Sequence, residues 1–68
     1  MSKYINQLPK EVQDAIKHDA IAILENTTDY SHDEIIDIVN NVVMDEKLIN
    51  VIGYEEGLLP YDKYSKYL

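Results

Sequence analysis

The stretch Leu8–Asn26, LPKEVQDAIKHDAIAILEN, decides the fold. At about 100° per residue, apolar side chains at steps of three and four share one stripe: Ile5, Leu8, Val12, Ile16, Ala20 and Ile23. Charged side chains occupy the opposite side: Lys10, Asp14, Lys17 and Glu25. Pro9 suits the first helical position, because its missing N–H needs no partner there. We therefore predict a helix over residues 9–25, preceded by a lead-in over residues 1–7.

Two residues break this pattern. Ile21 projects to the charged side, as scattered apolar residues often do, whereas Asp19 projects into the middle of the apolar stripe. An unpaired buried carboxylate costs several kcal/mol or shifts its pKa upward. We expect Asp19 to be partly buried and hydrogen-bonded to a tyrosine hydroxyl or to backbone N–H groups at another helix end. The alternative is that it lies at the rim of the stripe and reaches water.

A second helix is predicted in TTDYSHDEIIDIVNNVVM, residues 27–44. Ser31 followed three residues later by Glu34 is a capping box, in which each side chain bonds the other residue's backbone N–H. The apolar face that follows is wide: Ile35, Ile36, Ile38, Val39, Val42 and Val43. We predict a helix over residues 32–44. Its β-branched residues lower the intrinsic helix propensity, so tertiary packing must hold it.

The same stretch resembles a calcium-binding loop in part. The side chains at ligand positions one, three, five and nine of an EF-hand-like loop are Asp29, Ser31, Asp33 and Asp37. Glu34 stands where glycine is needed for the turn, and Asn40 stands where a bidentate Glu is needed. The capping box explains these residues instead, and two histidines without any cysteine make a weak ligand set. We expect no metal and no cofactor.

The helical register fails beyond Met44. Residues 45–53 form either a break or a new short helix that ends near Gly53. A strand over Lys47–Tyr54 is the alternative, but the sequence offers it no partner strand.

The last sixteen residues, GYEEGLLPYDKYSKYL, hold four of the six tyrosines of a chain without Phe or Trp. The side chains at steps of three and four predict a short final helix: Leu58, Tyr61, Tyr64 and Leu68. We expect Tyr61 and Tyr64 to pack inward, so that residues 58–68, which we call the tail, cover the two main helices. Tyr54 and Tyr67 lie off this stripe and are assigned to the surface as partner contacts.

The fold predicted for the whole chain is a single all-α domain, a small bundle of two main antiparallel helices and short C-terminal helical segments. At 68 residues the core is small, and a net stability of only about 3–5 kcal/mol is expected. Each main helix covers one apolar face, so the tail or a second copy must complete the core. A homodimer is therefore expected.

Net charge limits the classes of partner. Thirteen acidic residues against six Lys give a formal charge of −7. Direct binding of nucleic acid is disfavoured, because it depends on neutralising phosphates with Lys and Arg. Apolar stretches of signal-peptide or membrane-span length are absent from the sequence, so a cytoplasmic location without membrane insertion is expected.

Enzymatic chemistry is not indicated. The sequence contains no nucleophile motif and no glycine-rich phosphate loop. The adjacent pairs His18–Asp19 and His32–Asp33 should diverge by about 100° on their helices. We expect a protein that is not an enzyme.

Two stretches, INQLPKEVQDAIKHD (residues 5–19) and NNVVMDEKLINVIGY (residues 40–54), resemble small acidic proteins carried by phages and prophages of low-GC Gram-positive bacteria. The resemblance covers about the first fifty residues and carries over no site residue. It implies a protein that binds a host protein.

The function predicted from the sequence is therefore a non-enzymatic protein–protein interaction module. Its partner is expected to be a host protein with a basic surface, which it can inhibit by occupying a nucleic-acid-binding site. The side chains assigned to partner contact are Asp14, Glu25, Asp29, Asp33 and Asp37 with Tyr54 and Tyr67. The alternatives are a structural or regulatory homodimer without a foreign partner, and an acidity that provides solubility alone.

Overall fold

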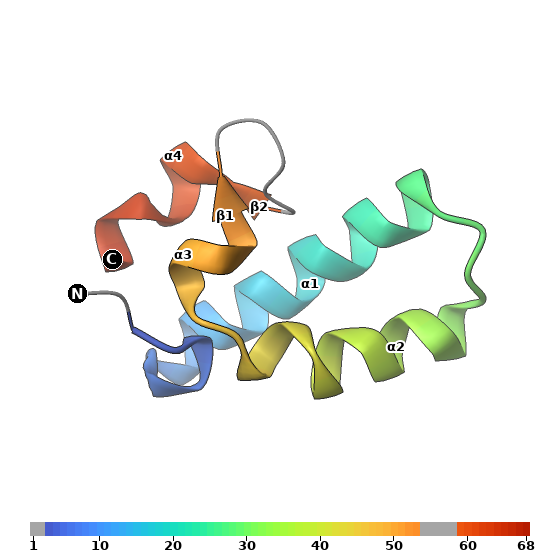
Figure 1. Cartoon of the computed structure of the whole chain (residues 1–68), viewed down its shortest axis with the longest axis horizontal. Helices are drawn as coiled ribbons and strands as arrows, with labels where there is room; N and C mark the ends of the chain where they lie inside the picture. The colour runs from blue at the N-terminus through green and yellow to red at the C-terminus, as the bar shows by residue number, and fades with distance from the viewer. Residues whose placement is uncertain (1–2, 54–58) are drawn as a thin grey trace.

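A computed structural model describes residues 3–53 and 59–68, and within these ranges the chain has the predicted all-α fold. The helices are α1 (Lys10–Thr27), α2 (His32–Asn41), α3 (Leu48–Val51) and α4 (Tyr61–Tyr64). The other elements are 3₁₀ turns at Ile5–Gln7, Val43–Asp45 and Ser65–Tyr67 and the two-residue strands β1 (Ile52–Gly53) and β2 (Leu59–Pro60). Helices α1 and α2 pack together with opposite chain directions (Figure 1).

Helix α1 begins one residue later than predicted and continues two residues further, with Pro9 as its N-cap. At its C-terminal end, the hydroxyl of Thr27 donates to the carbonyl of Ile23 at 2.7 Å, and that of Thr28 donates to Leu24 at 2.6 Å. Each threonine hydroxyl is an additional donor to a carbonyl group near the C-terminus of the helix, where backbone N–H donors from a following turn are missing. The polar sequence after Glu25 thus extends the helix before it ends.

The capping box at the start of α2 is confirmed. The hydroxyl of Ser31 accepts from the backbone N–H of Glu34 at 3.2 Å, and the Glu34 carboxylate accepts from the Ser31 N–H at 3.3 Å. The helix ends at Asn41, before the predicted Met44, because the backbone tightens into the 3₁₀ turn Val43–Asp45. This change of twist buries Val43 and Met44. It leaves Val42, which was predicted on the apolar face, 56% exposed.

The lead-in packs against the connection between α2 and α3. The backbone N–H of Ile5 donates to the Glu46 carbonyl at 2.9 Å, and the N–H of Leu48 donates to the Lys3 carbonyl at 2.8 Å. Helix α3 is a single turn, after which β1 pairs in parallel with β2. The expectation that a strand in this region has no partner was therefore wrong: Ile52–Gly53 pairs with the start of the tail.

The core draws on the lead-in, both main helices, the connection after α2, α3, both strands and α4. Its buried side chains are Ile5, Leu8, Val12, Ile16, Ala20, Ile35, Val39, Val43, Met44, Leu48, Val51, Ile52, Leu59 and Tyr64. The stripe predicted on α1 is confirmed as its central surface, with Ile23 half-buried at the edge. Ile21, predicted to be exposed, is also half-buried against the core. Because the lead-in and the tail cover the two main helices, the core closes within one chain.

The tail follows its predicted stripe only in part. Tyr64 is buried and Tyr61 is half-buried, as expected of side chains that pack inward, but Leu68 is 39% exposed. Tyr67, assigned to the surface, is half-buried against the core. The reason is that α4 continues as a 3₁₀ turn, in which residues three apart eclipse one another. Tyr67 therefore follows Tyr64 toward the core. Two other tail assignments, at positions 54 and 58, lie outside the described residues.

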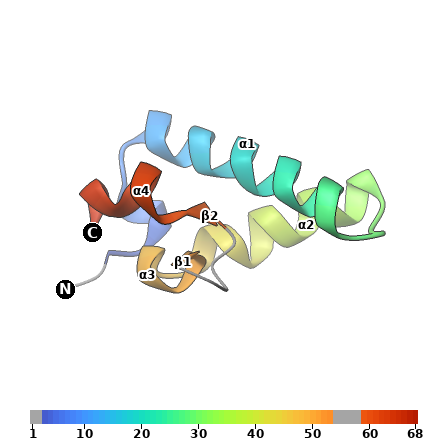
Figure 2. The same ribbon diagram turned by 90° about the horizontal axis from the view of Figure 1, so that it is seen from above.

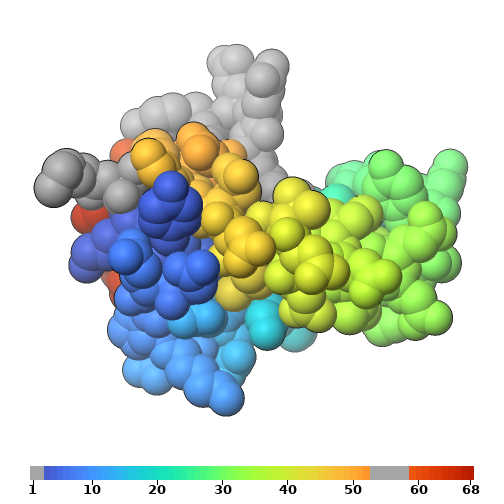
Figure 3. Space-filling model, turned by 60° about the horizontal axis from the view of Figure 1, so that its bottom comes forward, coloured from blue at the N-terminus to red at the C-terminus, as the bar shows by residue number. Residues whose placement is uncertain are grey.

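The molecule measures 34 × 24 × 16 Å along its principal axes. Helix α4 lies at the same end of the molecule as the lead-in and α3 (Figure 1 and Figure 2). The turn between α1 and α2 occupies the other end and protrudes from the thicker part of the molecule (Figure 3).

Deleting Pro60–Leu68 tests how far the core depends on the tail. This deletion removes Tyr64, which is 2% exposed. Loss of a buried aromatic side chain costs about 3–5 kcal/mol, comparable to the whole stability of a domain of this size. We expect the truncated chain to lose its cooperative thermal transition in circular dichroism. Deletion of the exposed Leu68 alone should change the free energy of unfolding by less than about 0.5 kcal/mol. A cooperative, full-length-like melt of the truncated chain would show that the tail does not belong to the core.

Candidate functional site

One carboxylate links the tail to the middle of α1. The side chain of Asp19 is 21% exposed, and its Oδ2 accepts two hydrogen bonds from the tail. The hydroxyl of Tyr64 donates at 2.5 Å and the ammonium of Lys63 donates at 2.7 Å. The expectation that a tyrosine hydroxyl satisfies Asp19 is confirmed. Lys63 was not expected there.

The contact shifts the pKa values of Asp19 and Tyr64. Burial raises the pKa of Asp19. The hydrogen bonds from Lys63 and Tyr64 and the charge of Lys63 lower it by a larger amount, so the pKa lies below its ordinary value of 3.8. Burial, the hydrogen bond to Asp19 and its negative charge raise the pKa of Tyr64 above its ordinary value of 10.0. At neutral pH the contact is therefore a carboxylate that accepts a hydrogen bond from a neutral phenol.

The two histidines approach different carboxylates, and one of these contacts was not expected. His18 was expected to diverge from Asp19, but its Nδ1 lies 3.6 Å from Asp19 Oδ1, with the imidazole pointing largely into solvent. His32 approaches Glu25 of the neighbouring helix, with Nδ1 2.9 Å from Oε1. This second contact ties the end of α1 to the start of α2.

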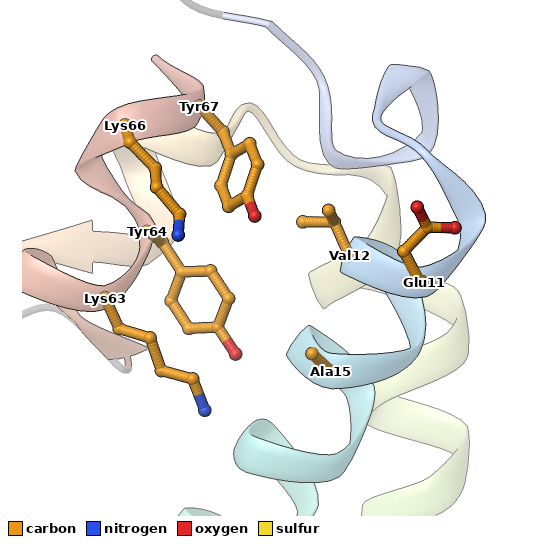
Figure 4. A pocket seen from close by; sticks show the side chains of 7 residues that line it. All are labelled: Glu11, Val12, Ala15, Lys63, Tyr64, Lys66 and Tyr67. Carbon is orange, nitrogen blue, oxygen red and sulfur yellow. The ribbon is translucent and has the colours of Figure 1, made fainter.

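A pocket of about 160 Å³ opens beside the Asp19 contact, between α1 and the tail. It is lined by Glu11, Val12 and Ala15 from α1 and by Lys63, Tyr64, Lys66 and Tyr67 from the tail. Both tyrosine hydroxyls point toward α1 (Figure 4). The ammonium of Lys63 lies 5.4 Å from the Tyr64 ring centroid and that of Lys66 lies 5.3 Å from the Tyr67 ring centroid, both within cation–π range. We call this hollow the tail pocket.

A second candidate surface lies at the turn between α1 and α2. It comprises Glu25 in the last turn of α1, Asp29 and Tyr30 in the connection, and Asp33 in the first turn of α2. All four side chains are exposed, and Tyr30 is 52% exposed. We call this set the turn surface.

The turn surface unites three of the side chains assigned to partner contact from the sequence. Asp37 lies one turn beyond Asp33 on α2 and extends it. Asp14 is exposed but lies eleven residues before Glu25, roughly 16 Å along α1. Tyr67 belongs to the tail pocket instead, and the remaining tyrosine of that assignment lies outside the described residues.

Sequence reasoning missed the exposed aromatic of the turn surface and the α1 wall of the tail pocket. The signal for Tyr30 was present, since a tyrosine between Asp29 and the helix-capping Ser31 has no apolar stripe to join. No local signal places Glu11 and Ala15 opposite Lys66, because the two walls come from opposite ends of the chain.

Across residues 3–53 and 59–68, His, Asp and Glu side chains do not gather in a group of three that could hold a metal ion. None of the helices described there is long and apolar enough to cross a membrane. No protein-family model, curated protein or solved structure matches the chain.

Asp19 should make the stability depend on pH in the acid range. Its pKa is lower in the folded chain than its ordinary value. Its contribution is therefore fully present above about pH 3.8 and is lost as the pH falls through the folded pKa. We expect the free energy of unfolding, from urea titrations, to fall more steeply over this range for the wild type than for Asp19→Asn. Asp14→Asn, which removes an exposed carboxylate from the same helix, should keep the wild-type slope. Equal slopes for wild type and Asp19→Asn would contradict the assignment.

Tyr64→Phe isolates the phenol of this contact. The ring can keep its place in the core, but the carboxylate of Asp19 loses one donor. Hydrogen bonds to charged groups contribute about 1.5–3 kcal/mol, so we expect a loss of about that size in urea unfolding. Tyr30→Phe removes a hydroxyl from an exposed ring and should change the stability by less than about 0.5 kcal/mol. Equal effects of the two substitutions would show that the hydroxyl of Tyr64 is not a structural donor.

Proposed function

We propose that this chain is a non-enzymatic protein–protein interaction module that binds a host protein with a basic surface. The observation that carries the proposal is the distribution of its acidic side chains. Within the described part of the chain, ion pairs engage the carboxylates of Asp19 and Glu25, the latter through a histidine. The other described acidic side chains are exposed, and no ion pair within that part engages them. Their charge is thus available to a partner.

The turn surface is the proposed centre of contact. It combines carboxylates with the exposed ring of Tyr30, and it protrudes from the body of the molecule (Figure 3). Tyrosine is enriched in interfaces because it offers a large apolar ring with a polar tip. Carboxylates around such a ring steer the approach of a basic partner and speed association.

The resemblance to small phage proteins gives the proposal its sharper form. The resemblance implies a protein that binds a bacterial host protein, and a surface rich in carboxylates can occupy a site that otherwise holds nucleic-acid phosphates. Asp29, Asp33 and Asp37 are exposed along the turn and α2, a presentation that is compatible with such an inhibitor.

A homodimer without a foreign partner was the alternative. It was expected because two helices alone cannot close a core, but the lead-in and the tail supply the missing cover. With that reason gone, the interaction module is the better supported function.

The proposal is tested by capture from a lysate of a low-GC Gram-positive bacterium on the immobilised chain. We expect one specifically retained protein, whose binding weakens as NaCl rises from about 0.05 to about 0.5 M, because screening shortens the range of charge interactions. The double variant Asp29→Asn/Asp33→Asn and the single variant Tyr30→Ala should each weaken binding of the purified partner. Circular dichroism should confirm that both remain folded.

The matched control is Asp45→Asn/Asp62→Asn, which removes the same charge from exposed positions away from the turn surface. It should retain binding. Equal losses in the two double variants would mean that net charge alone acts. Salt-independent binding, or a dimer in sedimentation that retains no host protein, would contradict the proposal.

A further inference from the structure

We infer that the tail pocket is the anchor site of the same interaction and receives one uncharged apolar side chain, such as leucine, from the partner. The inference rests on the proposed function, because it assigns a second contact to that partner. The pocket lies on the tail side of α1, whereas the turn surface lies at the far end of the α1–α2 pair (Figures 1 and 4).

Size limits the occupant. Pockets for drug-sized ligands and cofactors measure about 300–1,000 Å³, whereas this one measures about 160 Å³. Interfaces commonly depend on a few side chains that fill small pockets on the partner. A single side chain therefore fits the tail pocket better than a free ligand of cofactor size.

The walls favour an apolar occupant. Val12 and Ala15 on α1 face the two tyrosines of the tail, whose rings form the opposite wall (Figure 4). The pocket is also held open in advance, because Tyr64 and Lys63 are both fixed to Asp19. A preformed site loses less conformational entropy on binding than one that must be ordered.

The charges around the pocket balance, which argues against a charged occupant. Lys63 is paired with Asp19 at 2.7 Å, and Lys66 stands on the tail wall opposite Glu11 on α1. A charged side chain entering the pocket would lose its hydration and meet as much like charge as opposite charge. An uncharged side chain has no such cost. The flanking residues of the partner remain free to pair with Glu11 and Lys66 at the rim.

The test uses defined probes, so that it does not depend on identifying the partner. N-acetyl-L-leucine amide is titrated into the isotope-labelled chain, with the lysine and glutamate analogues in parallel, and followed by two-dimensional NMR. A probe of this size should bind with a Kd on the order of a few mM. We expect saturable shifts of the Val12 and Ala15 methyl signals with the leucine probe, and at least about tenfold weaker effects with the charged probes.

Ala15→Leu fills the pocket from the α1 wall and should abolish the saturable shifts, read at Val12. Ala22→Leu adds the same volume to an exposed position of the same helix and should leave them unchanged. Glu11→Gln removes the carboxylate of the rim and should strengthen binding of the glutamate probe relative to the leucine probe. This variant keeps the test decisive if Ala15→Leu fails to fold.

Three results would overturn the inference: no saturable binding of the leucine probe, equal binding by Ala15→Leu, or tighter binding of a charged probe to the wild type. A different result would contradict the proposed function: the absence of a host protein that the immobilised chain retains in a salt-dependent way. With a purified partner, Ala15→Leu should weaken binding to the chain without changing its salt dependence, whereas the double variant Asp29→Asn/Asp33→Asn should change both.

Discussion

The hydrogen bond from Tyr64 to Asp19 is the contact on which the position of the tail depends. Helix α4 is a single turn, too short to be stable alone, so tertiary contacts must hold it against α1. Leu59 and Tyr64 contribute apolar burial, which has no direction. The hydroxyl of Tyr64 and the ammonium of Lys63 supply direction, because both must reach one carboxylate in the middle of an apolar stripe. Asp19 therefore fixes where Tyr64 and Lys63 meet α1, while the pairing of β2 with β1 and the burial of Leu59 hold the start of the tail.

Local and periodic features of the fold were readable from the sequence, while contacts across the chain were not. The stripe on α1 and the capping box at Ser31 depend on spacings of three and four residues, and both were predicted correctly. Asp19 was recognised because a carboxylate within an apolar stripe needs a partner. The pairing of β1 with β2 and the docking of Ile5 on Glu46 join residues distant in sequence, for which no periodicity gives a signal. The position of Tyr67 was mispredicted because a 3₁₀ turn replaced the assumed α-helical step.

The two candidate surfaces were predictable to different degrees, because the residues of one are close together in the sequence and those of the other are not. Glu25, Asp29 and Asp33 lie within nine residues of one another, so the predicted hairpin of two helices was enough to bring them together. The tail pocket needs Ala15 and Lys66 to face each other across more than fifty positions. Only the folded tail creates that arrangement. Charge patterns along the sequence thus indicated one candidate surface and gave no sign of the other.

Residues that close the core also line the tail pocket, so the proposed binding there would be coupled to stability. Tyr64 is a core side chain, a donor to Asp19 and a wall of the pocket at once. A molecule that binds the folded chain and not the unfolded one raises the free energy of unfolding by mass action. In a domain with only about 3–5 kcal/mol of stability, an occupant of the pocket would strengthen the attachment of the tail itself. If the proposed partner binds there, stability and binding would both depend on the contact between α1 and the tail, and a substitution at this contact would change both.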